Sequence, residues 1–373
     1  MNLTRDQVIR HRIAAQQLDR EPGPARSVTD AAVLDLGVQD SGRDGASWAL
    51  ANRGVPISSP VALADTDDLV LAWTVRVSPH YYRRAEIADV MKATSPFDDD
   101  DAGRRMVGAA KHLATQGVDA EAAVAEVAKV MRRRVGKPTA KGELSAAVTE
   151  QLPAAYGAWC RPCHATHVPE SLFRMAALFG GLEIEPATSP PVLRRIPGWP
   201  QRPAGPASDP DSAPKHLQPI RGYLRLLGPA TPADVAGFLD TTATVIKAHW
   251  PDDAIEVRVD GKRKWLVGEV AEPEPVVRLL GPYDLLAQGK DRELLVPDTA
   301  HRKQLWPMLG RPGSLLVDGE IAGSWRPRAK GKKLDLEVEQ WRSRAVSRQR
   351  LTEQAERLAD HRGLSLGSVS PPS

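Results

Sequence analysis

Two cysteines and two histidines lie close together in the sequence, at Cys160, Cys163, His164 and His167. The Cys-x2-Cys spacing is one that structural zinc sites use, because two thiolates at this separation can bind one ion. The histidines, however, follow the cysteines without the loop that usually separates two ligand pairs. We therefore expect no bound metal here, and instead an ordinary turn with free cysteines before the next helix.

A second group of chemically distinctive residues is basic. Lys262, Arg263 and Lys264 follow the turn Asp260-Gly261, which joins two alternating segments that read as a β-hairpin. A basic hairpin tip is well placed to contact nucleic-acid phosphates, although a charged turn can also serve solubility alone. A second basic run lies on an expected strand connection: Arg326, Arg328, Lys330, Lys332 and Lys333.

The remaining composition excludes several classes of protein. The chain of 373 residues has 42% hydrophobic and 26% charged residues and a net charge of +3, ordinary values for a globular protein. Net charge this small does not by itself indicate nucleic-acid binding, so the placement of charge matters more. There is no Walker motif, no Gly-x-Gly-x-x-Gly after a strand and no Ser/His/Asp signature, and we expect no cofactor.

Compartment and membrane signals point the same way. No stretch of eighteen apolar residues occurs, and the first residues form a charged amphipathic pattern without the apolar core of a signal peptide. Two cysteines permit one short disulfide loop at most. We expect a protein of the reducing cytosol.

The clearest structural unit spans residues 217–268. An apolar helix ends at Gly228-Pro229, and Thr231 caps a second helix with Asp234 three residues later. A short turn leads into a third helix over 243–250, and the hairpin at 255–266 follows. Helix, short helix, turn, helix and hairpin is the order of a winged helix-turn-helix.

The rest of the chain predicts more helix than strand. Helices are expected at 4–18, 28–36, from 44 onward, 104–116, 120–134, 143–151, 170–179 and 343–358, and strands at 69–77, 182–186, 192–196, 313–318, 320–326 and 334–341. Six prolines between 197 and 214 indicate a linker or surface loop. The predicted fold class is mainly α with small β-sheets (α+β), built from tandem winged-helix units and a C-terminal β-rich region.

We predict the following division of the chain: a first winged-helix unit at 1–95, a helical second winged-helix-like unit at 96–200, a linker at 201–216, a third winged helix at 217–270, the β-rich region at 271–342, and a polar helix with a frayed tail at 343–373.

One segment is more specific. Residues Leu36-Gly37-Val38-Gln39-Asp40-Ser41, continuing to Arg53, resemble the signature of the AlkZ/YcaQ-type winged-helix DNA glycosylases, in which a Gln-x-Gln or Gln-x-Asp motif precedes an aromatic-rich helix ending in Arg. Further segments resemble other blocks of that family: Trp73-Thr-Val-Arg76-Val-Ser-Pro-His80, Leu280-Gly-Pro-Tyr283-Asp284, Lys290-Asp291-Arg292, Val317-Asp318-Gly319 and Gly323-Ser-Trp325-Arg326. The resemblance extends from about residue 3 to residue 341.

The resemblance implies monofunctional hydrolysis of the N-glycosidic bond of alkylated or crosslinked purines in duplex DNA. An N-alkylated purine is already a cationic leaving group, so the enzyme needs only to stabilise an oxocarbenium-like sugar and to position a water. Gln39 matches the first motif glutamine and would orient that water or the sugar. Arg76 and His80 match family positions on a strand and would contact DNA, although His80 can equally be a strand histidine bonded to the backbone.

Ser41 departs from the family pattern, because it stands where the family has glutamine or a carboxylate. Asp40 is adjacent, but one residue along a helix turns a side chain by about 100°, so Asp40 does not simply replace it. Gln39, Asp40 and Ser41 are therefore the candidate catalytic residues. Asp284 is expected to cap a turn.

Two other functions remain open. A catalytically silent DNA-binding or regulatory protein would keep the scaffold without the second motif residue, and a small-molecule enzyme would use the helical middle as a pocket. For either DNA-binding hypothesis we expect a monomer that binds double-stranded DNA, without a membrane, in the cytoplasm at the nucleoid.

Overall fold

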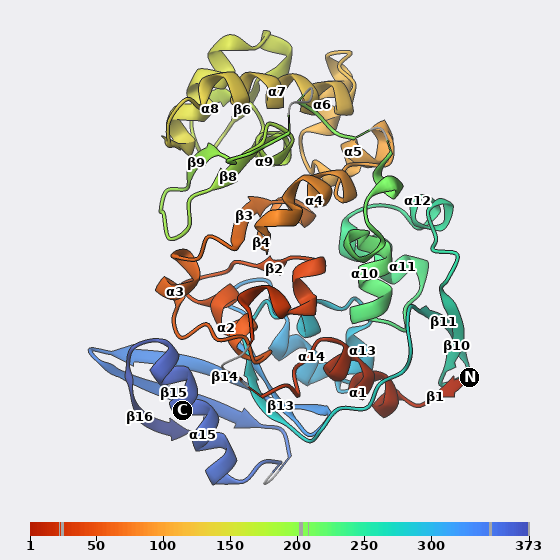
Figure 1. Cartoon of the computed structure of the whole chain (residues 1–373), viewed down its shortest axis with the longest axis vertical. Helices are drawn as coiled ribbons and strands as arrows, with labels where there is room; N and C mark the ends of the chain where they lie inside the picture. The colour runs from red at the N-terminus through yellow and green to blue at the C-terminus, as the bar shows by residue number, and fades with distance from the viewer. Residues whose placement is uncertain (22, 24–25, 201–203, 208, 343–344, 372–373) are drawn as a thin grey trace.

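The structure is a computed structural model that describes residues 1–21, 23, 26–200, 204–207, 209–342 and 345–371, with only the backbone described at 329 and 330. Figure 1 shows three regions around a central strand layer: a helical region at the top, a group of helices with a hairpin on the right, and a twisted sheet at the bottom left. The fold is mixed α+β. None of the helices in the described part of the chain has the length and apolar character that a membrane crossing requires.

The α-helices of the described residues are α1 (Arg5–Ala15), α2 (Gly45–Ala51), α3 (Pro60–Ala64), α4 (Ile87–Ala93), α5 (Asp99–Arg105), α6 (Ala110–Thr115), α7 (Ala120–Arg134), α8 (Lys141–Gln151), α9 (Glu170–Phe179), α10 (Pro219–Leu226), α11 (Pro232–Leu239), α12 (Ala243–Ala248), α13 (Arg292–Leu295), α14 (Thr299–Leu305) and α15 (Arg348–His361). The 3-10 turns that bear on the site are η1 (Val28–Asp30), η2 (Ala32–Asp35), η3 (Val75–Val77) and η8 (Leu285–Gln288).

The strands of the described residues are β1 (Asn2–Leu3), β2 (Val38–Gln39), β3 (Leu69–Trp73), β4 (Pro79–Arg83), β5 (Thr139–Ala140), β6 (Ala158–Cys160), β7 (Ala165–His167), β8 (Leu182–Ile184), β9 (Val192–Arg195), β10 (Ile255–Val259), β11 (Lys262–Leu266), β12 (Val277–Leu280), β13 (Gly313–Val317), β14 (Glu320–Lys330), β15 (Lys333–Gln340) and β16 (Ser365–Ser370).

The central layer is a six-stranded sheet with strand order β2-β4-β3-β8-β9-β5. It joins strands from both sides of the boundary predicted at residue 95, and β3 pairs with β8 through Leu71 and Ile184. A single buried core accompanies it, from Val28 in the first region to Leu285 near the C-terminal sheet. The N-terminal and middle regions therefore share one sheet and one core, and the predicted domain boundaries stay a prediction.

The helices and the hairpin predicted within 217–268 are present. Thr231 and Asp234 make a capping box at the start of α11, and Asp260 and Gly261, with φ angles of 48° and 77°, form the turn between β10 and β11. The hairpin gains a third strand, because β1 at the beginning of the chain pairs in parallel with β10. The elements follow in winged-helix order, and the tandem arrangement remains a proposal.

The C-terminal region contains the strands predicted there, in a five-stranded sheet of order β12-β13-β14-β15-β16. Helix α15 packs on it through Leu351, Ala355 and Leu358, residues of the second buried core. The segment predicted as a frayed tail instead forms β16, parallel to β15. Helix α15 returns the chain to the edge of the sheet, where β16 pairs with backbone groups of β15 that would otherwise be unpaired.

Three further element predictions were wrong. Residues 28–36 form the two turns η1 and η2, because Ala31 between them is extended with φ of −75° and ψ of 119°. The helix predicted at 104–116 is interrupted, since Met106 leaves helical geometry and Gly108 has φ of 83°. The strand predicted at 69–77 ends at Trp73, where a tight turn begins.

Helix α2 attaches the motif segment to the C-terminal sheet. Trp48 donates through Nε1 to the carbonyl oxygen of Leu279 at 2.6 Å, and Asn52 donates to the same oxygen at 3.1 Å. Arg53 makes two hydrogen bonds of 2.8 and 2.9 Å to the carboxylate of Asp284, and both side chains are fully buried. The C-terminal region therefore fixes the position of the residues that precede α2.

Candidate functional site

Gln39 lies at the edge of the central sheet, where β2 pairs with β4 and Gln39 stands opposite His80. Directly opposite residues of antiparallel strands project to the same face, so these two side chains share one side of the sheet. Gly37 allows the approach: its φ is 84°, and a Cβ at this position would lie 2.4 Å from the ring of Tyr82. The sequence before the motif is thus adapted to bring Gln39 against β4.

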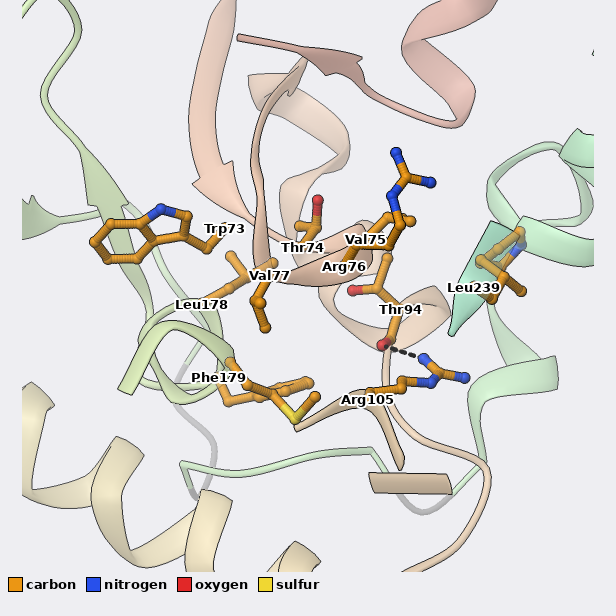
Figure 2. A pocket seen from close by; sticks show the side chains of 12 residues that line it. Trp73, Thr74, Val75, Arg76, Val77, Thr94, Arg105, Leu178, Phe179 and Leu239 are labelled. Carbon is orange, nitrogen blue, oxygen red and sulfur yellow. Dashed lines mark hydrogen bonds between the residues drawn. The ribbon is translucent and has the colours of Figure 1, made fainter. Parts of the chain in front are cut away.

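The connection between β3 and β4 presents Arg76. Arg76 and Val77 both have positive φ, of 55° and 47°. This conformation is unusual for a β-branched residue and costs on the order of 1–3 kcal/mol, which the surrounding structure must offset. Figure 2 shows the Arg76 guanidinium pointing away from the cavity beneath the turn, while Val77 points into it. That cavity is about 30 Å³, enough for about one water, so it is a packing gap.

Arg76 joins three segments that are distant in sequence. Its Nη2 donates to the Oε1 of Gln39 at 3.4 Å and to the Oε1 of Gln288 in η8. Its Nη1 donates to the carbonyl oxygen of Phe238 at 3.0 Å, and the guanidinium lies 4.6 Å above the Phe238 ring. Because Arg76 bonds the side-chain oxygen of Gln39, the amide nitrogen of Gln39 is left to act as a donor.

His80 lies behind this group and is 2% exposed. Its Nδ1 bonds the carbonyl oxygen of Ser78 at 2.9 Å and lies 3.2 Å from the Thr74 hydroxyl. Burial, followed by the charge of Arg76, lowers the pKa of His80 to about 3, so the ring is neutral at pH 7. This geometry favours the alternative of a strand histidine bonded to the backbone over direct contact with DNA.

Asp40 and Ser41 follow Gln39 on an extended segment and not on a helix. The Asp40 amide donates to the carbonyl oxygen of Pro79 at 2.8 Å, which continues the pairing of β2 with β4. Successive side chains of a strand alternate in direction, so Asp40 and Gln39 project to opposite faces. Burial, followed by the charge of Asp44, raises the pKa of Asp40 to about 6. The prediction that Asp40 and Ser41 lie on a helix, about 100° apart around its axis, was therefore wrong.

Four cations lie close enough to influence one another's charge, and the first of them bonds Gln39: Arg76, Lys290, Arg292 and Arg311. Burial, together with the charge of Arg311, lowers the pKa of each of the other three. Asp240 partly opposes this effect at Arg76 and Lys290. Within the described residues, none of the four cations forms an ion pair. Cations held together without carboxylate partners form a site for an anion, and a phosphate fits that charge.

Asp291 pairs with cations other than its two neighbours, so Lys290 and Arg292 remain available to bind an anion. Its carboxylate accepts from Arg12 at 2.9 and 2.7 Å and from Lys264 at 2.8 Å, and these charges keep the pKa of Asp291 well below its usual range. Arg12 is fully buried. The central residue of Lys290-Asp291-Arg292 thus points inward as an anchor. Its two neighbours are left on the surface side.

Two concave surfaces extend from this cation cluster. One, of about 680 Å³, includes the cations Lys262, Lys290, Arg292, Arg302 and Lys303 beside Trp306, together with the carboxylates of Asp234, Asp291 and Glu293. The other, of about 490 Å³, includes Ser41, Trp48, Tyr283, Arg311, Arg326 and Arg328. Because the first contains Lys290 and Arg292 and the second contains Arg311, the two surfaces and the cluster form one basic track past the motif segment. We call it the basic track below.

The cations predicted from the hairpin tip differ in their surroundings. Lys262 is exposed and lies on the basic track. Arg263 pairs with Glu256 at 2.7 Å and stacks over Trp265. Lys264 is 8% exposed and bonds Asp291, which favours a structural role because a phosphate would have to displace that carboxylate. The DNA contacts of Lys262 and Arg263 remain predictions.

The second predicted run divides along β14 and its turn. Arg326 is exposed and donates to the carbonyl oxygen of Gly310 at 2.8 Å, and Arg328 pairs with Glu337 at 2.6 Å. Both line the groove that contains Ser41. Lys332 and Lys333 are exposed near the tip of the β14–β15 hairpin, and the side chain of Lys330 lies outside the described residues. A role in DNA binding remains a prediction for this run.

Sequence reasoning did not assign a role to Gln288, Lys290, Arg292 or Arg311. Lys290 and Arg292 belong to the segment Lys290-Asp291-Arg292, which resembles a block of the family. Two cations on either side of an acid are the local signal that could have identified them. Gln288 and Arg311 carried no local signal. Both reach the site only because η8 and the segment before β13 pack beside the β3–β4 turn.

The Cys/His group also forms a cluster. One ligand atom of each of Cys160, Cys163 and His167 lies within 4.8 Å of the others, the arrangement that a metal ion requires. The hairpin of β6 and β7 brings His167 back beside the cysteines. The spacing argument made from the sequence, which required a loop between ligand pairs, does not apply to a hairpin.

Comparison with known proteins gives a consistent result. The family model described as DNA glycosylase AlkZ-like matches residues 33–361. Among solved structures, the DNA glycosylase AlkZ of Streptomyces sahachiroi is similar, with a TM-score of 0.73 and 20% identity over 100% of both chains. At this identity the likeness shows a shared fold. No curated protein matches the chain.

Proposed function

The chain belongs to the AlkZ-like DNA glycosylase family, and from this membership we propose that it hydrolyses the N-glycosidic bond of alkylated or crosslinked purines in duplex DNA. The proposal assigns the DNA phosphates to the basic track and the lesion nucleotide to the surface next to Gln39. The helices and hairpin of residues 219–266 then act as a winged helix against the duplex.

The observation that carries the proposal is the hydrogen-bonded group of Gln39, Arg76 and Gln288 beside the four cations. A strained turn presents Arg76, and Arg76 in turn bonds the side-chain oxygen of Gln39. Side chains fixed before the substrate arrives cost little reorganisation during the reaction. The DNA phosphates supply the anionic partners that the four cations do not have within the described residues.

The chemistry required of these residues is modest. An alkylated purine leaves as a neutral base, and the sugar becomes cationic in the transition state. Gln39 holds an attacking water or the sugar by its oriented amide. The charge of Asp40, which is largely ionised at pH 7, stabilises the cationic sugar through space although its side chain projects to the other face.

Ser41 favours one rival function. A hydroxyl group is shorter than the glutamine or carboxylate of the family motif, and it is only partly buried on the groove wall. A protein that binds duplex DNA along the basic track without releasing a base would have the same cations and fold.

One experiment separates the two functions. Purified protein is incubated with duplexes that carry alkylated or crosslinked purines, and released bases are measured for wild type, Gln39→Ala and Ser41→Gln. We expect release by wild type, a loss of about a hundredfold in Gln39→Ala, and duplex affinity unchanged within about threefold. Absence of release by wild type and by Ser41→Gln, on duplexes that both proteins bind, supports the silent DNA-binding protein.

A further inference from the structure

The hairpin of β6 and β7 is a separate two-stranded sheet between helices α8 and α9. It pairs Cys160 with Ala165 and Ala158 with His167, and Cys163 lies in the turn. Its side chains are exposed or only partly buried, and Trp159 is 65% exposed. A two-stranded hairpin with no buried face is at best marginally stable in water. Packing within the hairpin therefore does not account for its formation.

Three potential ligand atoms converge in this hairpin. The sulfur atoms of Cys160 and Cys163 and one ring nitrogen of His167 all lie within 4.8 Å of one another. Tetrahedral coordination, with zinc about 2.3 Å from sulfur and about 2.0 Å from nitrogen, separates ligand atoms by roughly 3.5–3.8 Å. Small rotations of side chains that are not buried close this difference.

The groups around the cluster orient its ligands. Nδ1 of His167 donates to the carbonyl oxygen of Val168 at 2.7 Å, which leaves the lone pair on Nε2. This is the arrangement in which metal-bound histidines are usually held, because it fixes the tautomer and the ring. The backbone amide of Cys163 donates to the sulfur of Cys160. An amide directed at sulfur stabilises the thiolate that binds a metal.

We propose that Cys160, Cys163 and His167 bind one zinc ion, which holds the β6–β7 hairpin closed, with a solvent molecule at the fourth position. Two thiolates and an imidazole are ligands that zinc prefers. The fourth position is assigned to solvent because Cys163 is exposed and, within the described residues, no fourth His, Cys, Asp or Glu belongs to the group of converging ligand atoms. His164 follows Cys163 directly but lies outside the group of converging atoms.

The position of the hairpin gives the ion a structural role. The segment after β7 is tied to α8, since the Val168 amide donates to Thr149 Oγ1 at 3.1 Å. Helix α9 begins two residues later, and its Phe173 contacts the ring of Trp73 with centroids 6.3 Å apart. Trp73 immediately precedes the turn that presents Arg76. Zinc therefore fixes the entry into the helix that supports this turn, without contacting the site itself.

The test uses the full-length protein, kept reduced so that a disulfide between the two cysteines does not form. Wild type, Cys163→Ser, His167→Ala and the matched control His164→Ala are equilibrated with zinc, desalted and measured by elemental analysis. We expect one zinc per chain in wild type and in His164→Ala. Cys163→Ser and His167→Ala should each retain less than about a tenth of it, because loss of one of three protein ligands weakens binding severely. With cobalt in place of zinc, wild type should show thiolate-to-metal charge-transfer absorption. Cys163→Ser and His167→Ala should not show it.

A second measurement does not depend on a substituted protein. Chymotrypsin should cut wild type after the exposed Trp159 faster once a chelator has removed the ion, and added zinc should restore resistance. Substoichiometric zinc in reduced wild type, equal zinc in Cys163→Ser and wild type, or cleavage after Trp159 that is insensitive to the chelator overturns the proposal. Loss of zinc in His164→Ala overturns the assignment of the fourth position to solvent.

Discussion

Replacing Asp40 with asparagine should make the protein more stable and, on the proposed function, less active. The pKa of the Asp40 carboxyl is 3.8 in its ordinary environment and about 6 in the fold. At a pH above both values the folded protein must keep this carboxyl ionised in a partly buried position beside Asp44. The difference of about two pKa units corresponds to at most about 3 kcal/mol of lost stability at pH 8.

The pH dependence gives this prediction its sign. Because the folded pKa is raised, folding takes up a proton between pH 3.8 and about 6, and the stability of wild type falls as the pH rises through that interval. Asparagine has nearly the shape of the protonated acid and does not titrate. The variant should therefore gain up to about 3 kcal/mol over wild type at pH 8, and most of that gain should vanish by about pH 4.

Urea unfolding of Asp40→Asn and wild type at pH 8, 6 and 4.5 measures the difference directly. Asp67→Asn is a suitable control, because Asp67 is exposed and its replacement should change the unfolding free energy by less than about 0.5 kcal/mol. A variant no more stable than wild type at pH 8, or a gain that does not change with pH, would refute the reasoning about Asp40.

The same substitution should lower base release about tenfold. Two unit charges about 8 Å apart interact by about 2 kcal/mol at an effective dielectric constant of about 20, and a charge of Asp40 acting over such a distance would account for about a tenfold effect. Release by wild type should increase with pH through about 6 as Asp40 ionises, and release by Asp40→Asn should lack that increase. Equal release by the two proteins at pH 7.5 would remove Asp40 from the catalytic candidates.

Three further outcomes are expected. Lys290→Ala combined with Arg292→Ala should weaken duplex binding and reduce the magnitude of the slope of log affinity against log salt by about 1.8. The control Lys215→Ala should leave that slope unchanged. An unchanged slope in the double variant would exclude phosphate binding along the basic track. Lys264→Met should reduce thermal stability and leave the slope within about 0.3, because Lys264 bonds Asp291; a slope reduced by about 0.9 would assign it a phosphate contact. Asp284→Ala should cost about 3–5 kcal/mol in urea unfolding, since it leaves Arg53 buried without its partner, and a loss below about 1 kcal/mol would contradict that role.

The helices and strands that carry local signals could be predicted from the sequence. Thr4 caps α1 with Gln7, Thr231 caps α11, and Asp260-Gly261 forms the turn between β10 and β11. These features could be predicted because each depends only on residues nearby in sequence. The segment at 28–36 was misjudged for the complementary reason. Its apolar residues face a core formed by distant parts of the chain, and that core accommodates two short turns separated by an extended Ala31.

The candidate site was predictable only in part. Gln39 and Arg76 were identified by resemblance to a family motif, and the structure places them within hydrogen-bonding distance of each other. Gln288 reaches Arg76 across 212 residues, and no local pattern encodes a contact of that range. Lys264 shows the limit of local pattern in another way: the hairpin predicts a phosphate contact, whereas the bond of Lys264 to Asp291 favours a structural role.

The pairing of β1 with β10 has a consequence for how the protein is made. Leu3 pairs with Val259, and Arg12 bonds the carbonyl oxygen of Gly228, so the first two elements complete their contacts only with the third region of the chain. At about 5–20 residues per second, a ribosome needs roughly 13–50 seconds to synthesise the intervening residues. During that interval the apolar side of α1, with Ile9 and Ile13, has no partner to cover it. The nascent N-terminal segment should therefore be a binding site for chaperones that the finished protein no longer offers.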